Sequence, residues 1–368
     1  MIEFVCQNKN GVFDVKNQKI TLGSDIFVYP IKWTDRPGRL YIIFSTRCNI
    51  RCSYCFQNTI DKISTDISID EIFNYITYFQ NDISEIVLFG GEPLLKENYK
   101  YIVSVIERFD YFKFIIFTNG NFESCYRDLI EKYSCCIQSV IITLDGSREI
   151  HNKRRVNPVK DSYQLIMDNL FFLADKDVVL DVQMNVDIDN AESFHELMRE
   201  VSYDSKLKNQ DYTLNPVKYI KNSISYEELL NLFFDLREKY PQRIFVNNRL
   251  ITNLLYLFNG RPLFKHRCGL DRTYVISLPH NVIYSCPQNP SSISGYITDG
   301  KIFVDSRKIE NNILSTQYKR NKCIDCDYSY LCPYCCPYVP EGNECVSKVE
   351  QLLKITLQHF DLISEKIF

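Results

Sequence analysis

The chain has 368 residues, of which 45% are hydrophobic and 24% charged, and its formal net charge at pH 7 is −3; this is an ordinary globular composition, long enough for one barrel and a small additional domain. The weak charge, without any basic run, gives no argument for nucleic-acid binding, and no apolar segment approaches membrane-spanning length. Because the N-terminus also lacks a signal-peptide pattern, we expect a cytoplasmic protein that binds neither nucleic acid nor membrane.

Cysteine is the unusual part of the composition, with fifteen residues in the chain. In a protein without a secretion signal, so many cysteines argue against a disulfide framework. They favour metal ligation under reducing conditions.

Residues 1–38 are predicted to form a small β cap. Asn10–Gly11 lies between short apolar runs and favours a hairpin turn, and Lys19–Leu22 is predicted as a further strand. Cys6 is expected to be a buried thiol of this cap.

Residues 39–217 alternate apolar strands with amphipathic helices. The predicted strands are 40–45, 85–89, 113–118, 138–144, 178–186 and 211–216, and the predicted helices are 69–80, 97–108, 123–134, 161–175 and 191–202. Ser68 and Glu71 form a capping box at the first helix. This alternation predicts an α/β fold, a partial (β/α)6 TIM-like barrel with its functional groups at the carboxyl ends of the strands. An open α/β sheet is the alternative.

Residues 218–368 differ from the barrel segment in composition and in their pattern of predicted elements. Residues 218–260 are predicted as bridging helices, at about 226–239 and 248–258. Residues 261–350 combine cysteines, prolines and glycines with short strands and are predicted as a small C-terminal domain. A final amphipathic helix is predicted at about 346–366, so that 351–368 form a C-terminal helix.

A loop with three cysteines, Cys48, Cys52 and Cys55, follows the first barrel strand. Three thiolates on one short loop can hold three irons of a [4Fe–4S] cube and leave the fourth iron open to a ligand. A zinc site is one alternative, although it usually takes four ligands and begins with C-x2-C. Three unrelated buried thiols are the other alternative.

Polar groups and glycines follow the next strands of the predicted barrel. Gly90 and Gly91 allow close approach of backbone to a ligand, and Glu92–Pro93 follow directly. Thr118–Asn119 end the third strand, and an ordinary turn explains them almost equally well.

The C-x3-C-x2-C loop, with Tyr54 before its third cysteine, resembles that of the radical S-adenosylmethionine (SAM) superfamily. The resemblance implies that SAM chelates the open iron through its amino and carboxylate groups. It also implies that an electron from the cluster cleaves SAM to methionine and a 5′-deoxyadenosyl radical, which removes a hydrogen atom from the substrate.

The same resemblance implies a set of SAM contacts. The segment Gly90–Pro93, with Glu92, would receive the SAM ammonium. Thr143 would bind the ribose and Arg155 the carboxylate, with Arg154 as second choice for the carboxylate; a solvated basic helix start is the alternative for these arginines. The remaining implied contacts are Thr118, Asn119 and Asn185 as polar groups and Tyr54 against the adenine.

The C-terminal cysteines resemble the pattern of the SPASM domain. Its last five cysteines are Cys323, Cys326, Cys332, Cys336 and Cys345, in the spacing C-x2-C-x5-C-x3-C, a gap and C. Its first pair is Cys268 and Cys286, although Asn281 stands where the pattern has glycine. Because asparagine tolerates a left-handed turn position, we still expect a hairpin over 274–285.

The SPASM resemblance implies two auxiliary [4Fe–4S] clusters. One would be held by Cys323, Cys326, Cys332 and Cys345, and the other by Cys268, Cys286 and Cys336. Some relatives place a fourth ligand where this chain has Pro262, so Cys335, His266, substrate or water would complete the second set. Two zinc sites are the alternative. We interpret Cys125, Cys135 and Cys136 as structural.

SPASM enzymes mostly modify peptides or proteins, so the resemblance implies a maturase that forms a thioether or carbon–carbon crosslink in a ribosomally made peptide. The implied partners are the peptide, a flavodoxin- or ferredoxin-type reductant and, since residues 1–38 are too short for a leader-binding domain, either a separate leader-binding protein or the barrel itself.

Two other functions remain open at this point. An anaerobic sulfatase-maturating enzyme would carry an aspartate directly after the second SPASM cysteine, but Pro287 follows Cys286 here, and Asp271 or Asp299 would have to replace that base. A non-catalytic iron–sulfur electron carrier is the third interpretation, and it leaves the SAM-binding motifs unexplained.

Overall fold

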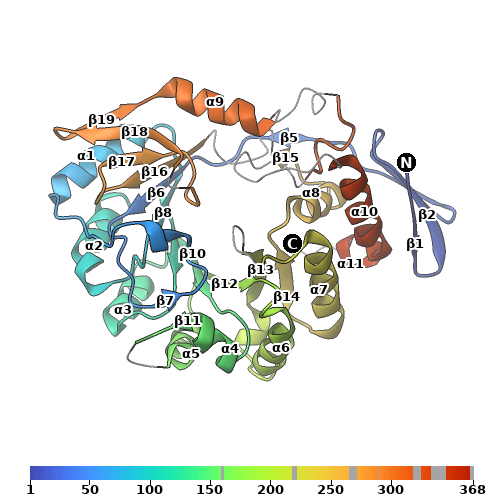
Figure 1. Cartoon of the computed structure of the whole chain (residues 1–368), viewed down its shortest axis with the longest axis horizontal. Coiled ribbons are helices and arrows are strands. Elements are labelled where there is room, and N and C mark those ends of the chain that lie inside the picture. Colours follow the sequence, from blue (N-terminus) through green and yellow to red (C-terminus); the bar gives the residue numbers. More distant parts are fainter. Residues whose placement is uncertain are drawn as a thin grey trace.

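The computed structural model describes residues 1–158, 161–217, 222–264, 272–289, 291–317, 325–332 and 345–364. Within these residues, one sheet of eleven strands curls into an open arc, and helices cover its outer face (Figure 1). We call the concave side of this sheet the lumen. From one edge to the other, its strands are β14 (Arg243–Val246), β13 (Asp211–Pro216), β12 (Val179–Val186), β10 (Ile137–Thr143), β9 (Lys113–Thr118), β8 (Glu85–Phe89), β6 (Arg39–Ile43), β16 (Thr273–Ser277), β17 (Val282–Tyr284), β18 (Ile293–Thr298) and β19 (Lys301–Val304).

The run from β14 to β16 is parallel, and β17 to β19 continue the sheet as antiparallel strands. All six strands predicted from the sequence form, and the predicted α/β partial barrel is confirmed. The sheet nevertheless extends beyond them on both sides. β14 lies inside the segment for which only helices were predicted, and β16 joins the C-terminal region directly to β6.

The helices lie where the amphipathic pattern predicted them. They are α1 (Ile69–Phe79), α2 (Tyr99–Arg108), α3 (Ser124–Lys132), α5 (Ser162–Leu173), α6 (Phe194–Ser202), α7 (Tyr226–Lys239) and α8 (Arg249–Phe258), with the short α4 (Arg148–Arg154) after β10. The capping box at α1 is confirmed, since the Ser68 hydroxyl accepts from the Glu71 amide at 3.2 Å. Within the described residues, no helix is long and apolar enough to cross a membrane.

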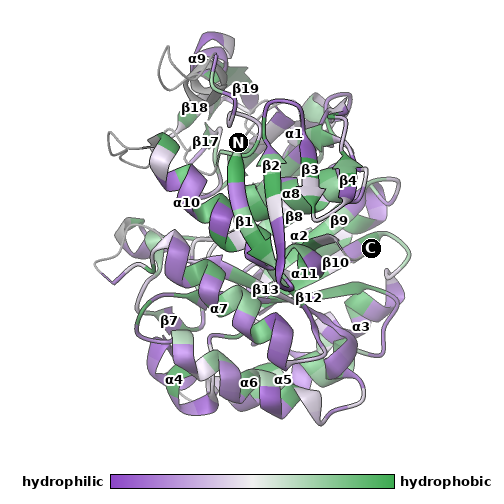
Figure 2. Ribbon diagram, turned by 90° about the vertical axis from the view of Figure 1, so that its right-hand side faces the viewer, coloured by the Kyte–Doolittle hydropathy of each residue, from purple (hydrophilic) through white to green (hydrophobic). Residues whose placement is uncertain are grey.

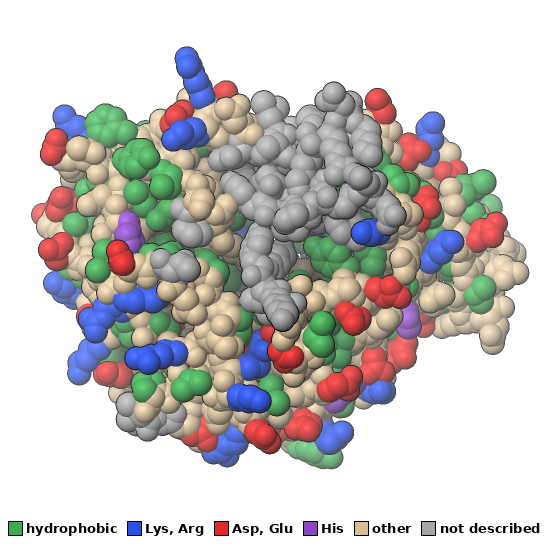
Figure 3. All heavy atoms as spheres, viewed as in Figure 1, with side chains coloured by type: hydrophobic (Ala, Val, Ile, Leu, Met, Phe, Trp, Pro, Cys, Tyr) green, Lys and Arg blue, Asp and Glu red, His purple; other side chains and the backbone are tan. Residues whose placement is uncertain are grey.

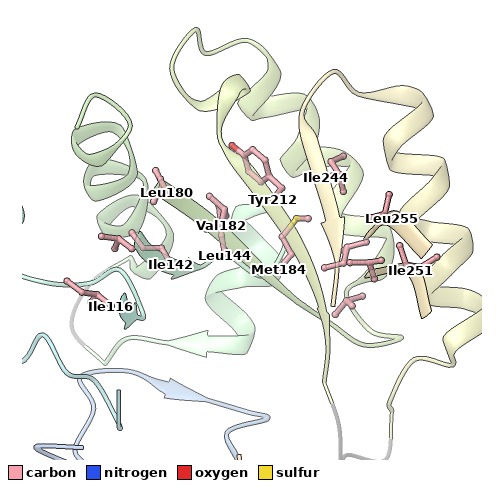
Figure 4. Close-up of a cluster of buried hydrophobic side chains, with 14 of the residues drawn as sticks. Ile116, Ile142, Leu144, Leu180, Val182, Met184, Tyr212, Ile244, Ile251 and Leu255 are labelled. Carbon is pink, nitrogen blue, oxygen red and sulfur yellow. The ribbon is translucent and has the colours of Figure 1, made fainter. Parts of the chain in front are cut away.

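Alternation along the strands separates the outer core from the lumen. Leu180, Val182 and Met184 of β12 point outward and pack in a cluster that includes Ile251 and Leu255 of α8 (Figure 4). Because strand side chains alternate between faces, the odd-numbered residues of β12 face the lumen. The outer cluster is buried and supplies most of the hydrophobic stabilisation of the barrel.

The N-terminal cap forms a separate four-stranded sheet of β1 (Ile2–Cys6), β2 (Lys9–Asp14), β3 (Lys19–Leu22) and β4 (Asp25–Val28), in which β1 packs against α10 (Cys345–Gln358; Figure 2). The hairpin prediction at Asn10–Gly11 is wrong. The turn lies at Gln7–Asn8, both with positive φ, and Gly11 is inside β2. Gly11 is needed there because the Phe4 ring lies over it, 2.4 Å from where a Cβ would be.

Two further differences lie in the C-terminal region. A helix that was not predicted, α9 (Ser306–Gln317), follows β19. The predicted final helix is divided into α10 and α11 (Phe360–Ser364), because a turn at His359 places Phe360 against Phe4 and Phe258. The predicted hairpin over 274–285 forms as β16 and β17, and Asn281 has φ +54° as expected.

Candidate functional site

A cavity of about 400 Å³ opens at the carboxyl ends of β6, β8, β9 and β10. All three cysteines of the loop after β6 line it. On the face that Figure 3 shows, Lys and Arg side chains gather over the region of β7 (Arg51–Cys52), whereas acidic side chains gather toward α6 and α7. The cavity therefore lies where parallel α/β folds place their chemistry.

The cysteine loop is held in place by backbone pairing. β7 pairs with β11 (Arg155–Val156) in an antiparallel ribbon that sets Cys52 opposite Arg155. The Ser53 amide donates to the Arg154 carbonyl at 2.9 Å, and the Asn49 side chain donates to the Asn121 carbonyl at 2.7 Å. The loop is thus fixed to the strand ends on both sides of the cavity.

The donor set of Cys48, Cys52 and Cys55 fits a cluster better than a single ion. A zinc tetrahedron with bonds of about 2.3 Å would bring its sulfurs within about 3.8 Å of one another. Within the described residues, no group of three or more Cys, His, Asp or Glu side chains can hold one metal ion. Thiols set apart around one cavity match the separate corners of a cube.

Burial disfavours ionisation of two of these thiols, Cys48 and Cys52. It raises the pKa of Cys52 to about 12 against the opposing effect of Arg155, and it also raises the pKa of Cys48. Metal binding requires the thiolate form, so iron would supply the positive charge that these thiols need.

Gly90 and Gly91 lie against the backbone of the cysteine loop. A Cβ at Gly91 would be 2.1 Å from the Arg47 carbonyl oxygen, and Gly90 has φ +141°. The Gly91 and Glu92 amides donate to the Ser45 and Arg47 carbonyls at 3.1 and 2.9 Å. Only glycines fit this approach, and both line the cavity.

Glu92 lies behind the cavity wall. Its fully buried carboxylate accepts hydrogen bonds from the Leu94 amide, the Thr118 hydroxyl and the Asn119 amide at 2.7–2.8 Å. Burial raises the pKa of Glu92 to about 7, and these hydrogen bonds oppose the shift. The side chain thus ties β8 to β9, the adjoining Pro93 is also buried, and contact of either with an ammonium group stays a prediction.

Thr118 and Asn119 both line the cavity. The Asn119 side chain donates to Asn49 Oδ1 at 2.7 Å and lies 3.5 Å from Cys48 Sγ. Asn119 therefore contacts a predicted iron ligand, a position that sequence reasoning did not assign to it.

The two arginines that were candidates for a carboxylate differ in their surroundings. Nη1 of Arg154 donates to both carboxylate oxygens of Asp187 at 2.9 and 2.7 Å, and the Arg154 guanidinium lies 4.9 Å from the centre of the Tyr54 ring. Arg155 lines the cavity and donates to the Tyr54 hydroxyl at 2.8 Å. Both side chains have buried nitrogens without a hydrogen-bond partner among the described residues, Nε of Arg155 and Nε and Nη2 of Arg154, so the cavity lining is what distinguishes Arg155. Arg155 is thus placed to bind an anion in the cavity.

Tyr54 is held by its hydroxyl. It donates to Asp145, a fully buried carboxylate, and accepts from Arg155 and from the Asn185 side chain. Burial raises the pKa of Tyr54 well above its usual value, with Arg155 opposing the shift. The phenol is therefore neutral, and its ring faces the cavity.

Thr143 lines the cavity, and its contact with a ribose stays a prediction, whereas the Asn185 side chain is hydrogen-bonded to Tyr54 and Asn215 outside the lining. The sequence analysis missed several lining residues because each is an ordinary strand or loop residue that no motif marks. They are Arg47, Ile50, Arg51, Phe56, Gln57, Asn58, Lys62, Phe89, Phe117, Ile141 and Gln183. Strand alternation alone would have found Phe89, Phe117, Ile141 and Gln183.

The lumen beside the cavity has two unlike walls. The wall of β6, β8, β9 and β16 is an apolar cluster of Tyr41, Ile43, Val87, Ile115 and Val275 with Phe89, Phe117, Ile141 and Tyr284 packed on it. The wall of β12 and β13 carries Asp181, Gln183 and Asn185 beside Asp211, Thr213 and Asn215. The polarity of the lumen changes between β10 and β12.

Asp181, on this polar wall, makes the free energy of unfolding of the protein depend on pH. Burial, with a smaller contribution from Asp211, raises its pKa from 3.8 to about 6. Between these values the folded chain holds a proton that the unfolded chain releases, so Asp181 lowers stability as pH rises through this range. We expect Asp181→Asn to raise the free energy of unfolding by on the order of 2 kcal/mol near pH 8 and by much less near pH 4.

Denaturant titrations at the two pH values test this expectation. The control is Asp161→Asn, which removes the carboxylate that caps α5 and pairs with Arg148 and should lower stability near pH 8 instead. An equal gain for Asp181→Asn at both pH values would contradict the assigned pKa.

Only part of the predicted auxiliary sites falls in the described chain. Cys286 follows β17 in a turn where its amide donates to the Ser292 hydroxyl at 3.0 Å. Cys326 and Cys332 lie in a short segment anchored by buried Tyr330, whose hydroxyl donates to the Val15 carbonyl at 2.9 Å. Cys268, Cys323, Cys335, Cys336, His266 and Asp271 lie outside the described residues, and so does the side chain of Cys345.

The other cysteines lie away from the cavity lining. Cys6 and Cys136 are buried, Cys125 is half-buried and Cys135 is exposed. Their structural interpretation stays a prediction.

Residues 42–201 match the radical SAM superfamily. A cysteine-type anaerobic sulfatase-maturating enzyme of Clostridium novyi is 25% identical over 336 residues, which cover 81% of this chain and 87% of that protein. A pyruvate formate-lyase-activating enzyme of Staphylococcus epidermidis is 38% identical over 69 residues, and the chain spans 28% of its length.

Two solved structures share the fold. Native anSMEcpe with bound AdoMet has a TM-score of 0.65 at 17% identity, covering 89% of this chain and 99% of that one. Streptococcus suis SuiB bound to precursor peptide SuiA has a TM-score of 0.61 at 14% identity, covering 85% and 76%. The superfamily implies a [4Fe–4S] cluster and SAM. The chain is therefore an enzyme that carries a radical SAM superfamily domain at residues 42–201 and is similar over most of its length to a sulfatase-maturating enzyme.

Proposed function

We propose that this enzyme modifies a ribosomally made peptide, forming a thioether or carbon–carbon crosslink. The observation that supports this most is the single cavity lined by Cys48, Cys52, Cys55 and Arg155, which opens into a lumen with one apolar and one polar wall. When bound, the cluster and SAM would together supply the 5′-deoxyadenosyl radical that removes a hydrogen atom from the peptide.

The chain's own residues would bind and orient the cosubstrate. Cys48, Cys52 and Cys55 would hold the cluster, and Gly90–Gly91 offer backbone to the SAM ammonium because they carry no side chain there. Arg155 would bind the carboxylate, since it is the one of the two adjacent arginines that lines the cavity. Thr118, Asn119 and Thr143 line the same cavity as polar contacts for SAM. Tyr54 would lie against the adenine.

Crosslinking removes two hydrogen atoms from the peptide. One hydrogen atom leaves to the 5′-deoxyadenosyl group, and the second leaves as a proton and an electron. We propose that Cys323, Cys326, Cys332 and Cys345 would hold one auxiliary [4Fe–4S] cluster and Cys268, Cys286 and Cys336 another, and that these clusters would supply the acceptor for the electron. With three cysteines, the second set would leave a position for a substrate thiolate, which favours a thioether.

Sulfatase maturation is the second candidate, because the Clostridium novyi sulfatase-maturating enzyme aligns with most of this chain. It would convert a cysteine to formylglycine, which needs a base near the reacting carbon. Pro287 takes the position directly after Cys286, and Asp299 lies in the turn between β18 and β19.

A partner must also deliver the electron that cleaves SAM. We propose a flavodoxin- or ferredoxin-type reductant, which is acidic in character. Arg47, Arg51 and Lys62 border the cavity beside the cysteine loop. A separate leader-binding protein is the proposed partner for peptides that the barrel does not bind directly.

The test uses the enzyme reconstituted anaerobically with iron and sulfide, then reduced with dithionite in the presence of SAM. Two peptides serve as probes, the Kp18Cys peptide bound in an anSMEcpe structure and the SuiA precursor bound by SuiB. Loss of two hydrogen atoms from either peptide supports crosslinking, and an aldehyde in place of the thiol supports sulfatase maturation. Absence of 5′-deoxyadenosine would instead favour an electron carrier.

The variant Cys286→Ala tests whether Cys286 is a ligand of an auxiliary cluster, separately from cleavage of SAM at the primary site. We expect this variant to produce 5′-deoxyadenosine at the wild-type rate and no modified peptide, because Cys286 is outside the SAM cavity lining. Cys125→Ala is the matched control, since this half-buried thiol lies on the outer helix α3. An unchanged yield of modified peptide from Cys286→Ala would contradict the auxiliary cluster.

A further inference from the structure

Three asparagines form one row on the polar wall of the lumen. Asn185 of β12 is paired with Asn215 of β13 in the parallel register. Asn247 follows β14 one position beyond the pair of Leu214 and Val246, which brings it level with Asn215. The three side chains therefore stand side by side at the carboxyl ends of three neighbouring strands, about 4.8 Å apart.

Hydrogen bonds run along this asparagine row in one direction. Asn247 Nδ2 donates to Asn215 Oδ1 at 2.8 Å, and Asn215 Nδ2 donates to Asn185 Oδ1 at 2.6 Å. Asn185 Nδ2 then donates to the Tyr54 hydroxyl at 3.1 Å. The row begins at the open side of the lumen, where Asn247 is exposed, and ends at the cysteine loop, where Asn185 is 9% exposed.

These hydrogen bonds orient each carboxamide but use only some of its donors and acceptors. A carboxamide has two N–H donors and two oxygen lone pairs. Within the asparagine row, Asn185 and Asn215 each use one donor and one lone pair, and Asn247 uses one donor. Among the described residues, each asparagine of the row therefore keeps at least one side-chain N–H and one oxygen lone pair without a partner in the row.

The chemistry of the row suits a polypeptide main chain. A main chain also offers one N–H and one C=O per residue and carries no charge. A phosphate or carboxylate ligand would call for cationic groups, whereas these three side chains are neutral amides. The adjoining apolar wall, with Phe89 and Phe117 in the cavity lining, would receive a side chain of the same peptide.

We propose that Asn185, Asn215 and Asn247 bind the main chain of the substrate peptide at the mouth of the lumen, largely independent of its side chains. This inference rests on the proposed function as a peptide maturase. It adds the binding surface and the mode of recognition, which lead the peptide from the open edge at β14 toward Tyr54 and the cysteines.

The test compares Asn215→Ala and Asn247→Ala with wild type, using the reconstituted enzyme with SAM and the two peptide probes. We expect the dissociation constant of both peptides to rise roughly tenfold in each variant, because a hydrogen-bonding partner of the peptide main chain is lost. SAM affinity and peptide-independent release of 5′-deoxyadenosine should not change. Asn209→Ala is the matched control, since Asn209 lies just before the opposite end of β13.

Each other outcome counts against the proposal. Unchanged peptide affinity in both variants would remove the binding role, and a loss for one peptide alone would show side-chain recognition. A parallel loss of SAM affinity would show that the row only positions Tyr54. Because Asn247 is exposed, its variant remains informative even if Asn215→Ala is destabilised.

Failure of the two proposals can be told apart. If wild-type enzyme releases 5′-deoxyadenosine but binds neither peptide, main-chain recognition is contradicted. If it releases none, the proposed function itself is contradicted.

Discussion

Replacing Cys48, Cys52 and Cys55 together by alanine is expected to abolish 5′-deoxyadenosine formation and to remove about four irons per chain. The three thiols line one cavity, and the loop that carries them is fixed at both sides by backbone pairing. No thiolate would then remain there to hold the cluster. Iron analysis after anaerobic reconstitution and product chromatography measure the two effects.

Cys135→Ala is the matched control for the triple variant, because Cys135 is an exposed thiol outside the cavity lining. It should retain wild-type iron and activity. Retention of the full iron content by the triple variant would contradict the assignment of the primary cluster, and loss of iron by Cys135→Ala would point to adventitious binding.

Arg155→Met is expected to weaken SAM binding roughly 100-fold, because it removes a charged donor from the cavity. Arg154→Met should leave SAM affinity nearly unchanged. It should instead lower the free energy of unfolding by about 3–5 kcal/mol, since it leaves Asp187 buried without its ion-pair partner. Equilibrium binding of SAM and denaturant titration separate the two effects.

Arg155→Lys provides the second arm of this experiment. A lysine keeps the charge and loses the planar fork, so partial recovery of SAM affinity is expected. A variant series in which Arg154→Met loses SAM affinity and Arg155→Met retains it would reverse the assignment.

The barrel could be predicted from the sequence because the local apolar pattern of each strand agrees with the pairing that the strand makes in the folded sheet. Each predicted strand is a buried apolar run, and α1 and α7 both carry capping boxes. β14 was missed because Arg243–Val246 has four residues between two helices and alternates too briefly to stand out. It exists because β13 offers it a parallel edge.

Residues of the site could be predicted only where a sequence motif needs one particular amino acid at a position. Gly91 is such a case, because a side chain there would collide with the Arg47 carbonyl. Glu92 shows the limit: its motif marks it as important, while its burial places it behind the wall. Gln183 and the asparagine row depend on which strands become neighbours, and no single stretch of sequence contains that information.

The antiparallel step from β16 to β17 has a consequence for the path of electrons. β6 runs toward the Cys48 loop at one end of the lumen, and β16 runs beside it in the same direction. β17 returns, so that Cys286 leaves the sheet near the level of Arg39, about 13 Å down the strands from Ile43 at a rise of about 3.3 Å per residue. If Cys48 and Cys286 both hold iron as proposed, the electron would enter at one end of the lumen and leave at the other. The substrate would lie between the two irons, so the reacting peptide itself would be on the path of the electron.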